Sequence, residues 1–111
     1  MKEGYIYILS SKNRTVFYIG VTNNLQRRVL EHKAGLGSAF TKRYNLKFLM
    51  YYEEFKTIED AIVREKQLKN WHRSWKINLI KETNPELDDL GADWYSEEEI
   101  REFVESQDYI T

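Results

Sequence analysis

Hydrophobic and polar positions near the start of the chain follow the pattern of β-strands. The run Tyr5–Leu9 is apolar and aromatic, and a second such run covers Val16–Gly20. The residues between them, 10–15, are polar. Aromatic and β-branched residues favour strands, and a short polar segment between two such runs is typical of a hairpin. The pattern predicts an antiparallel β-hairpin, with a third strand over residues 47–55.

Helical signals begin after the second strand. Asn23 or Asn24 is suited to cap a helix that ends near Lys33, because an asparagine side chain accepts hydrogen bonds from the first helical turn. The sequence Thr-Ile-Glu-Asp that begins at Thr57 approximates a capping box and starts a second long helix. The predicted helices cover residues 24–33, 57–70 and 72–82, with a short basic turn or helix at 38–44. The order ββαβαα predicts an α+β fold, with helices flanking a small three-stranded antiparallel or mixed sheet.

Strand alternation assigns the hairpin side chains to two faces. Tyr7 lies on one face of the first strand, and Ile6 and Ile8 lie on the other. In the second strand, Tyr18 shares a face with Gly20. We therefore expect Tyr7 and Tyr18 to lie near one another. Packing of the two rings in a core is the structural alternative to a chemical role for this pair.

Composition narrows the class of protein. The chain has 111 residues, of which 41% are hydrophobic and 14% aromatic, so it suits one folded domain and not a disordered chain. The absence of cysteine excludes a disulfide scaffold, a thiol nucleophile and a thiolate metal site. No apolar run approaches the ~20 residues that cross a bilayer, and the apolar run at the start is too short for a signal peptide. We expect a soluble, cytoplasmic protein with no membrane partner.

The net charge of -1 conceals a strong asymmetry along the chain. Residues 1–81 carry 16 Lys or Arg and 7 Asp or Glu, a net charge of +9. Residues 82–111 carry 1 Arg and 11 Asp or Glu, a net charge of -10. A basic body attracts polyanions, of which nucleic acid is the commonest. An ordinary solvated surface with an acidic terminus is the alternative.

The acidic tail has helical features of its own. Ser96–Glu99 reads as a capping box, and Ile100, Phe103 and Val104 form a narrow apolar stripe after it. Such a stripe docks on the body of the protein or on a partner. A tail with this charge also suits a phosphate mimic that folds over the basic groove and competes with nucleic acid; simple packing or solubility is the plainer explanation.

Arg28 and His32 lie four residues apart and share one face of the first predicted helix. Neither is an anion, so the two do not stabilise each other as an ion pair. Facing a phosphate, the guanidinium supplies a fork of donors and the imidazole supplies a proton relay. The alternative is that both side chains face solvent on a basic helix.

Glu65 is the anomaly of the second long helix. It falls on the apolar stripe between Ala61 and Leu68. A carboxylate turned toward a core is costly unless it is paired or binds a metal. An ion pair or an edge position are the structural alternatives, and a single carboxylate beside substrate phosphates is a common way of holding Mg²⁺.

The order of these features resembles the GIY-YIG nuclease family, in particular its small stand-alone bacterial members and the N-terminal nuclease domain that makes the 3′ incision in the excinuclease ABC repair system. Tyr5-Ile6-Tyr7 corresponds to the first motif, with Tyr in place of Gly at its first position, and Tyr18-Ile19-Gly20 matches the second in full. The resemblance covers about residues 3–90 and implies a nuclease domain over residues 1–90, followed by the acidic tail 91–111. Its remaining landmarks fall on Arg28, His32, Glu65 and, less closely, Asn84.

The resemblance implies a metal-dependent endonuclease that hydrolyses phosphodiester bonds in DNA with low sequence specificity, in repair or recombination. Glu65 would hold one divalent ion, Mg²⁺ or Mn²⁺, and Arg28 would neutralise the phosphate. Tyr7 would act as general base, aided by Tyr18 or His32. Because an ordinary tyrosine has a pKa of about 10, this role needs the metal and two nearby cationic side chains to lower the pKa.

Two other functions remain open. The first is a nucleic-acid-binding module with weak or no nuclease activity, and the second is a protein-interaction module that keeps only the fold. For the first, the candidates for phosphate contact are Lys42, Arg43, Lys69 and Arg73, with Lys47, Lys66 and Lys76, and those for stacking are Tyr44, Trp71 and Trp75. The DNA is duplex, branched or single-stranded, and a repair protein is a further candidate partner.

Overall fold

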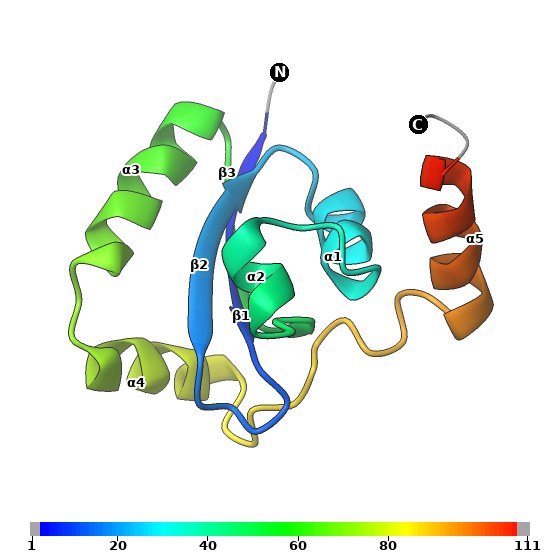
Figure 1. Cartoon of the computed structure of the whole chain (residues 1–111). Coiled ribbons are helices and arrows are strands. Elements are labelled where there is room, and N and C mark those ends of the chain that lie inside the picture. Colours follow the sequence, from blue (N-terminus) through cyan, green and yellow to red (C-terminus); the bar gives the residue numbers. More distant parts are fainter. Residues whose placement is uncertain (1–2, 109–111) are drawn as a thin grey trace.

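A three-stranded antiparallel sheet forms the centre of the molecule in a computed structural model, which describes residues 3–108 (Figure 1). The strands are β1 (Gly4–Ser10), β2 (Phe17–Thr22) and β3 (Phe48–Phe55), in the order β2-β1-β3. The hairpin pairs Tyr7 with Gly20. The predicted α+β fold is confirmed, and both strand pairs are antiparallel.

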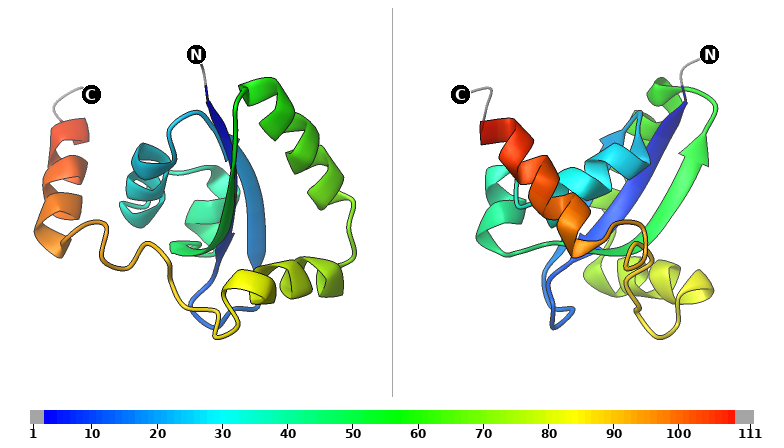
Figure 2. Two further views of the ribbon diagram at one scale, coloured as in Figure 1. Left: turned by 180° about the vertical axis from the view of Figure 1, so that it is seen from behind. Right: turned by 90° about the vertical axis from the view of Figure 1, so that its right-hand side faces the viewer.

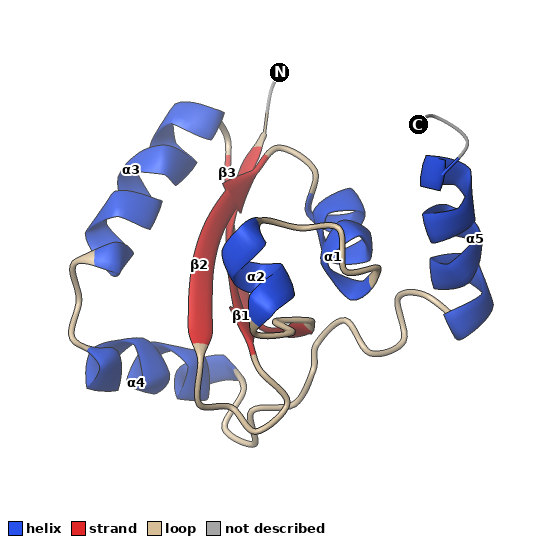
Figure 3. Cartoon of the chain, viewed as in Figure 1, coloured by secondary structure: helices blue, strands red, loops and turns tan. Residues whose placement is uncertain are grey.

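Helices cover both faces of this sheet (Figure 3). The helices that do so are α1 (Leu25–Lys33), α2 (Ala39–Arg43), α3 (Ile58–Lys69) and α4 (Arg73–Thr83), and a further helix, α5 (Glu97–Asp108), stands beyond α1. Seen from the front and from behind, α3 and α4 lie on one side of the sheet, and α1 and α2 lie on the other (Figures 1 and 2). Two short layers of core are therefore built on one sheet.

Strand alternation separates these two layers as the sequence predicts. The isoleucines of β1 and β2 face α3 and α4 and join a buried cluster with Leu68 and Ile80. Tyr7 faces the opposite way and packs in a second cluster with Leu25 and Val29 of α1. Tyr7, the predicted catalytic residue of β1, is therefore buried in the layer that also contains Arg28 and His32.

Side-chain caps fix where the helices begin. The side chain of Asn24 accepts a hydrogen bond from the Arg27 amide, so the cap of α1 is Asn24 rather than Asn23. The Thr57 hydroxyl accepts from the Asp60 amide at the start of α3. Each cap satisfies an amide that has no partner within its own helix.

The acidic tail is joined to α1. A capping box starts α5, with the Glu99 amide donating to the Ser96 hydroxyl at 3.1 Å and the Ser96 amide donating to the Glu99 carboxylate at 3.0 Å. The Tyr95 hydroxyl donates to the Gln26 carbonyl at 2.7 Å, and the Arg27 guanidinium lies 5.3 Å from the centre of the Phe103 ring. In Figure 1, α5 stands beside α1 on the side away from α3.

A partly buried ion pair also ties this region to α1. Lys33 Nζ lies 2.7 Å from an Asp89 carboxylate oxygen, and the other oxygen accepts from the Leu49 and Gly91 amides.

Within residues 3–108, none of the helices is both long enough and apolar enough to span a bilayer.

Candidate active site

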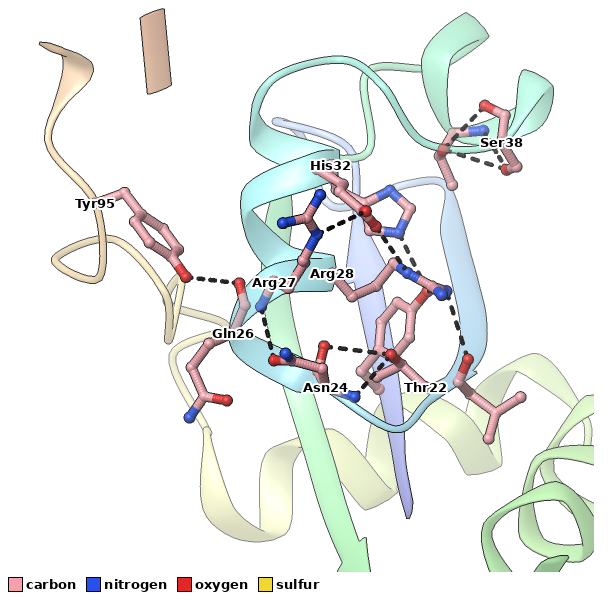
Figure 4. Close-up of polar contacts among 12 residues, drawn as sticks. Thr22, Asn24, Gln26, Arg27, Arg28, His32, Ser38 and Tyr95 are labelled. Carbon is pink, nitrogen blue, oxygen red and sulfur yellow. Dashed lines mark hydrogen bonds and ion pairs between the residues drawn. The ribbon is translucent and has the colours of Figure 1, made fainter. Parts of the chain in front are cut away.

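Four of the predicted site residues meet at one cavity on the α1 side of the sheet. Tyr7 and Tyr18 come from the hairpin, and Arg28 and His32 come from α1. The cavity has a volume of about 190 Å³, and Glu31 and the loop 36–38 complete its lining. In Figure 4, Arg28 and His32 extend from α1 toward the sheet, while Tyr95 lies on the other side of the helix.

The Tyr7 hydroxyl is held between the two side chains of α1. Arg28 Nη1 donates to the Tyr7 oxygen at 3.3 Å, and the same oxygen lies 3.1 Å from His32 Nε2. The guanidinium can only donate, whereas the donor in the Tyr7–His32 bond depends on which ring nitrogen carries the His32 proton. With that proton on Nδ1, the Tyr7 hydroxyl donates to Nε2 and its oxygen keeps one further lone pair.

Two glycines give the tyrosine and histidine rings their space. A Cβ atom built on Gly20 would lie 2.4 Å from the Tyr7 hydroxyl oxygen, and one built on Gly37 would lie 2.4 Å from His32 Nδ1. Real atoms do not approach this closely, so a side chain at either position displaces a ring. The glycine of the second tripeptide motif is therefore needed for close packing across the hairpin.

Burial controls the protonation of the two rings. It raises the pKa of Tyr7 to about 12, although Arg28 acts in the opposite direction. Burial and then the positive charge of Arg28 lower the pKa of His32 to about 4. The site thus contains one cation where the sequence suggests two, and the pKa of Tyr7 is raised instead of lowered. The physical reason is that removal from water disfavours both the phenolate and the imidazolium.

Glu31 is a member of the site that the sequence analysis missed. Its carboxylate accepts from Arg28 Nε at 3.0 Å and lies 3.4 Å from Arg27 Nε. The sequence contains the signal, because Glu31 is spaced three and four residues from the two arginines on a helix. Its effect is to orient the Arg28 guanidinium toward Tyr7.

Glu65 lies on the other face of the sheet from this cavity, in α3. Its side chain is 15% exposed and its carboxylate lies 3.4 Å from Lys69 Nζ. Lys69 in turn lines a second cavity, of about 330 Å³, together with Tyr18 and Phe40. Tyr18 borders both cavities, so the edge strand β2 separates Glu65 from the tyrosine–histidine cluster. Within residues 3–108, no group of three or more Asp, Glu, His or Cys residues is arranged to hold a metal ion.

The predicted phosphate-binding residues fall into two sets. All four are exposed; Lys42 and Arg43 lie on α2, and Lys69 faces the cavity beside Tyr18. Arg73 is engaged with the protein itself, since it donates to the Thr15 carbonyl and its guanidinium lies 4.9 Å from the centre of the Phe17 ring. The structure therefore leaves the two residues of α2 and Lys69 better placed for a ligand than Arg73.

The side chain of Asn84 is buried and hydrogen-bonded to the main chain of the protein. It is 4% exposed, and its side-chain amide donates to the Met50 and Asp88 carbonyls at 3.1 and 2.8 Å. Its side-chain oxygen accepts from the Asp88 amide. These bonds fasten the turn after α4 to β3, and the lining residues of the Tyr7 cavity do not include Asn84.

Trp71 and Trp75, the two tryptophans that are candidates for stacking, differ in burial. Trp71 is half-buried against the core on the α3 side, and the Arg64 guanidinium lies 5.3 Å from the centre of its ring. Trp75 is exposed and meets the Trp71 ring edge to face. A packing role is thus observed for Trp71.

Known proteins are similar to this chain in sequence and in fold. The family model described as the GIY-YIG catalytic domain matches residues 3–78. A UPF0213 protein of Staphylococcus haemolyticus is 34% identical over 82 residues, which cover 74% of this chain and 99% of that protein. A UPF0213 protein of Clostridium perfringens is 37% identical over 76 residues, or 68% of this chain and 81% of that protein.

A solved structure extends the likeness to the fold. The solution NMR structure of a UPF0213 protein from Bacillus halodurans has a TM-score of 0.51 and 25% identity, and it covers 82% of this chain and 97% of that one. The chain therefore belongs to the GIY-YIG family.

Proposed function

We propose that this protein is a metal-dependent endonuclease that hydrolyses phosphodiester bonds in DNA with low sequence specificity. One observation carries the proposal: a buried tyrosine hydroxyl, Tyr7, is held between a guanidinium and a neutral imidazole at a cavity open to a ligand. A fold needs no such trio for packing, whereas phosphate chemistry needs a base, a proton acceptor and a cation.

The three side chains support a proton path. The free lone pair of the Tyr7 oxygen takes a proton from the attacking water while the Tyr7 hydroxyl proton moves to His32 Nε2. The water oxygen then bonds to phosphorus, and the bond from phosphorus to the leaving oxygen breaks. Arg28 neutralises charge on the phosphate and on the Tyr7 oxygen, and Glu31 keeps it oriented.

The path is strongly uphill in the free protein. A pKa of about 12 for Tyr7 and about 4 for His32 means that the proton stays on the phenol. A bound phosphate anion opposes the charge of Arg28, which favours a protonated His32. Substrate is therefore part of what makes the base effective.

Glu65 fits a metal site in which the protein supplies a single carboxylate ligand. It is one carboxylate, mostly buried, with a lysine 3.4 Å away that a cation would displace. Mg²⁺ is commonly held by one or two carboxylates together with substrate phosphates, and it keeps several waters. When bound, Mg²⁺ or Mn²⁺ would supply Lewis-acid stabilisation to the leaving oxygen. Lys69 would then be free to contact the substrate.

Low sequence specificity follows from the kinds of contact available. Lysine and arginine bind backbone phosphates, which position a nucleic acid without reading its sequence. A role in DNA repair or recombination, a partner among repair proteins and a cytoplasmic location complete the proposal, on the strength of the family membership and the composition.

The test is cleavage of labelled duplex, branched and single-stranded DNA and of RNA, in Mg²⁺, Mn²⁺ or EDTA. The parent protein is compared with Glu65→Ala, Arg28→Ala and Tyr7→Phe. Matched controls are Glu59→Ala, an exposed carboxylate of the same helix as Glu65, and Arg27→Ala, the neighbour of Arg28.

We expect metal-dependent cutting of DNA that is lost in the three site variants and kept in both controls. Loss of one general base or one preorganised donor typically costs about 10²–10⁴ in rate. Cleavage by Glu65→Ala at the parent rate would refute the role of Glu65.

The raised pKa of Tyr7 favours one alternative, a nucleic-acid-binding module with weak or no nuclease activity. In that case the parent protein binds DNA with a steep salt dependence and cuts none of the substrates in any metal.

A further inference from the structure

An unbroken row of aromatic rings leads out of the Tyr7 cavity onto the surface. The Tyr7 and Tyr18 ring centres are 6.3 Å apart, those of Tyr18 and Phe40 are 6.2 Å apart, and those of Phe40 and Tyr44 are 4.9 Å apart. Burial falls along the row, from the fully buried Tyr7 to Phe40 and Tyr44, which are 44% and 40% exposed. We call Tyr18, Phe40 and Tyr44 the aromatic row.

The short helix α2 holds the rings of Phe40 and Tyr44 at the surface of the protein. Phe40 lies in α2 and Tyr44 is the C-cap residue that follows the helix, and their ring centres lie 4.9 Å apart on one side of it. The opposite side is anchored by Thr41, which is buried and hydrogen-bonded to the Ser38 cap. Neither Phe40 nor Tyr44 joins either buried core cluster within residues 3–108. The rings are therefore exposed on a helix that is held by other residues.

Positive charge accompanies the aromatic row. Lys69 and Lys76 line the 330 Å³ cavity between Tyr18 and Phe40, on the side of α3 and α4. On α2 itself, Lys42 and Arg43 are exposed beside the two rings, and the Arg43 guanidinium lies 5.4 Å from the centre of the Tyr44 ring. Cations thus stand on both flanks of a line of exposed rings.

We propose that the aromatic row binds unpaired nucleotides of a nucleic-acid strand and guides that strand to the Tyr7 cavity. Bases without a partner expose faces that stack on aromatic rings, and their phosphates pair with flanking cations. Bases in a duplex are stacked on one another, so they offer no face to the row. This deepens the proposed function, on which it rests, by naming the substrate class: single strands, or branched and flapped DNA with a single-stranded segment.

The test measures binding apart from cleavage. Fluorescence anisotropy in EDTA follows a labelled oligothymidylate of about 15 nucleotides and a duplex of the same length. The central variant is Phe40→Leu/Tyr44→Leu, which removes the rings and keeps apolar side chains on the surface. The matched control is Tyr52→Leu, since Tyr52 is 44% exposed on β3 and outside the row. Circular dichroism verifies the fold of each variant.

We expect the parent to bind the single strand more tightly than the duplex. Each lost stacking contact should weaken single-strand binding about 5- to 150-fold, the equivalent of about 1–3 kcal/mol. Duplex binding should change less than about twofold, because it depends on phosphate contacts. Tyr52→Leu should bind both ligands as the parent does.

Three binding results would overturn the proposal: no preference for the single strand, unchanged single-strand binding by the double leucine variant, or an equal loss for both ligands. A parent that self-associates in sedimentation, with a double leucine variant that stays monomeric, would assign the row to a protein interface instead.

Cleavage assays of the same proteins in Mg²⁺ and Mn²⁺ separate this proposal from the proposed function. Ring-dependent binding without cutting would refute the nuclease and keep the aromatic row. Cutting that is insensitive to the leucine substitutions would refute the row and keep the nuclease.

Discussion

Acidification should destabilise this protein through one buried side chain, His32. The ring is 4% exposed, and Nδ1 has no hydrogen-bond partner within residues 3–108. Burial and the nearby Arg28 lower the pKa of His32 to about 4, whereas an unfolded chain has the ordinary value of about 6.5. Between these values the unfolded state binds more protons than the folded state, so stability falls as pH falls.

The size of this effect follows from the two pKa values. With about 6.5 in the unfolded state and about 4 in the folded state, the free energy of unfolding decreases by about 2 kcal/mol between pH 7 and pH 5. The full loss, reached below the folded pKa, is about 3 kcal/mol. Typical total stabilities are about 5–15 kcal/mol, so the change is easily measured.

The measurement is urea unfolding at 25 °C, followed by circular dichroism at pH 7, 6 and 5. His32→Gln is the matched variant, because glutamine does not titrate and its amide can still accept from Tyr7. We expect a loss of about 2 kcal/mol for the parent and less than about 0.5 kcal/mol for His32→Gln over this pH range. The reasoning is refuted if the two proteins lose stability equally, since the titrating group would then lie elsewhere.

Three further results are expected. Gly20→Ala should cost about 1–3 kcal/mol of stability in urea unfolding, because its Cβ would meet the Tyr7 ring, and an unaffected midpoint would contradict the close packing. Asp89→Asn should cost about 1–3 kcal/mol by thermal unfolding, because it leaves the partly buried Lys33 ammonium without its anion; a loss near zero would show that the pair does not form in solution. Replacing the glutamates of α5 by glutamine should tighten DNA binding in low salt and have less effect in high salt, and an unchanged affinity in low salt would rule out competition by the tail.

Alternation and helix capping make most of the fold predictable. Two apolar runs separated by polar residues determine the hairpin, and period-two alternation places Tyr7 and Ile6 on opposite faces. Asn24 and Thr57 have the side chains that begin helices, and both do so. These features are local in sequence, so the sequence alone contains them.

The protonation state of the site is not predictable in the same way. Whether a tyrosine has a raised or a lowered pKa depends on how much water reaches it, and this depends on how α1 and the loop at Gly37 close over the hairpin. The position of Glu65 relative to Tyr7 also depends on the layer order of the sheet. The family resemblance assigns both residues to one reaction, but it gives no indication that β2 stands between them.

The exposure of the Phe40 and Tyr44 rings is a second feature that the sequence does not predict. The basic neighbourhood of Tyr44 suggests stacking, but Phe40 escapes notice, because a phenylalanine in sequence reads as a core residue. Only the packing of Thr41 underneath shows which side of this short helix is free.

The placement of α5 makes the molecule an electric dipole. Its acidic helix stands at one side of α1, whereas α3 and α4 lie across the sheet, in a molecule whose extents are 40 × 36 × 24 Å (Figure 2). Although the net charge is only -1, the protein therefore still responds to an external electric field. In the field of a polyanion, a torque turns the basic body toward the ligand and α5 away from it, before any contact forms. The orientation of the first encounter, and with it the rate of productive association at low ionic strength, is thus determined by a helix that touches none of the reacting groups.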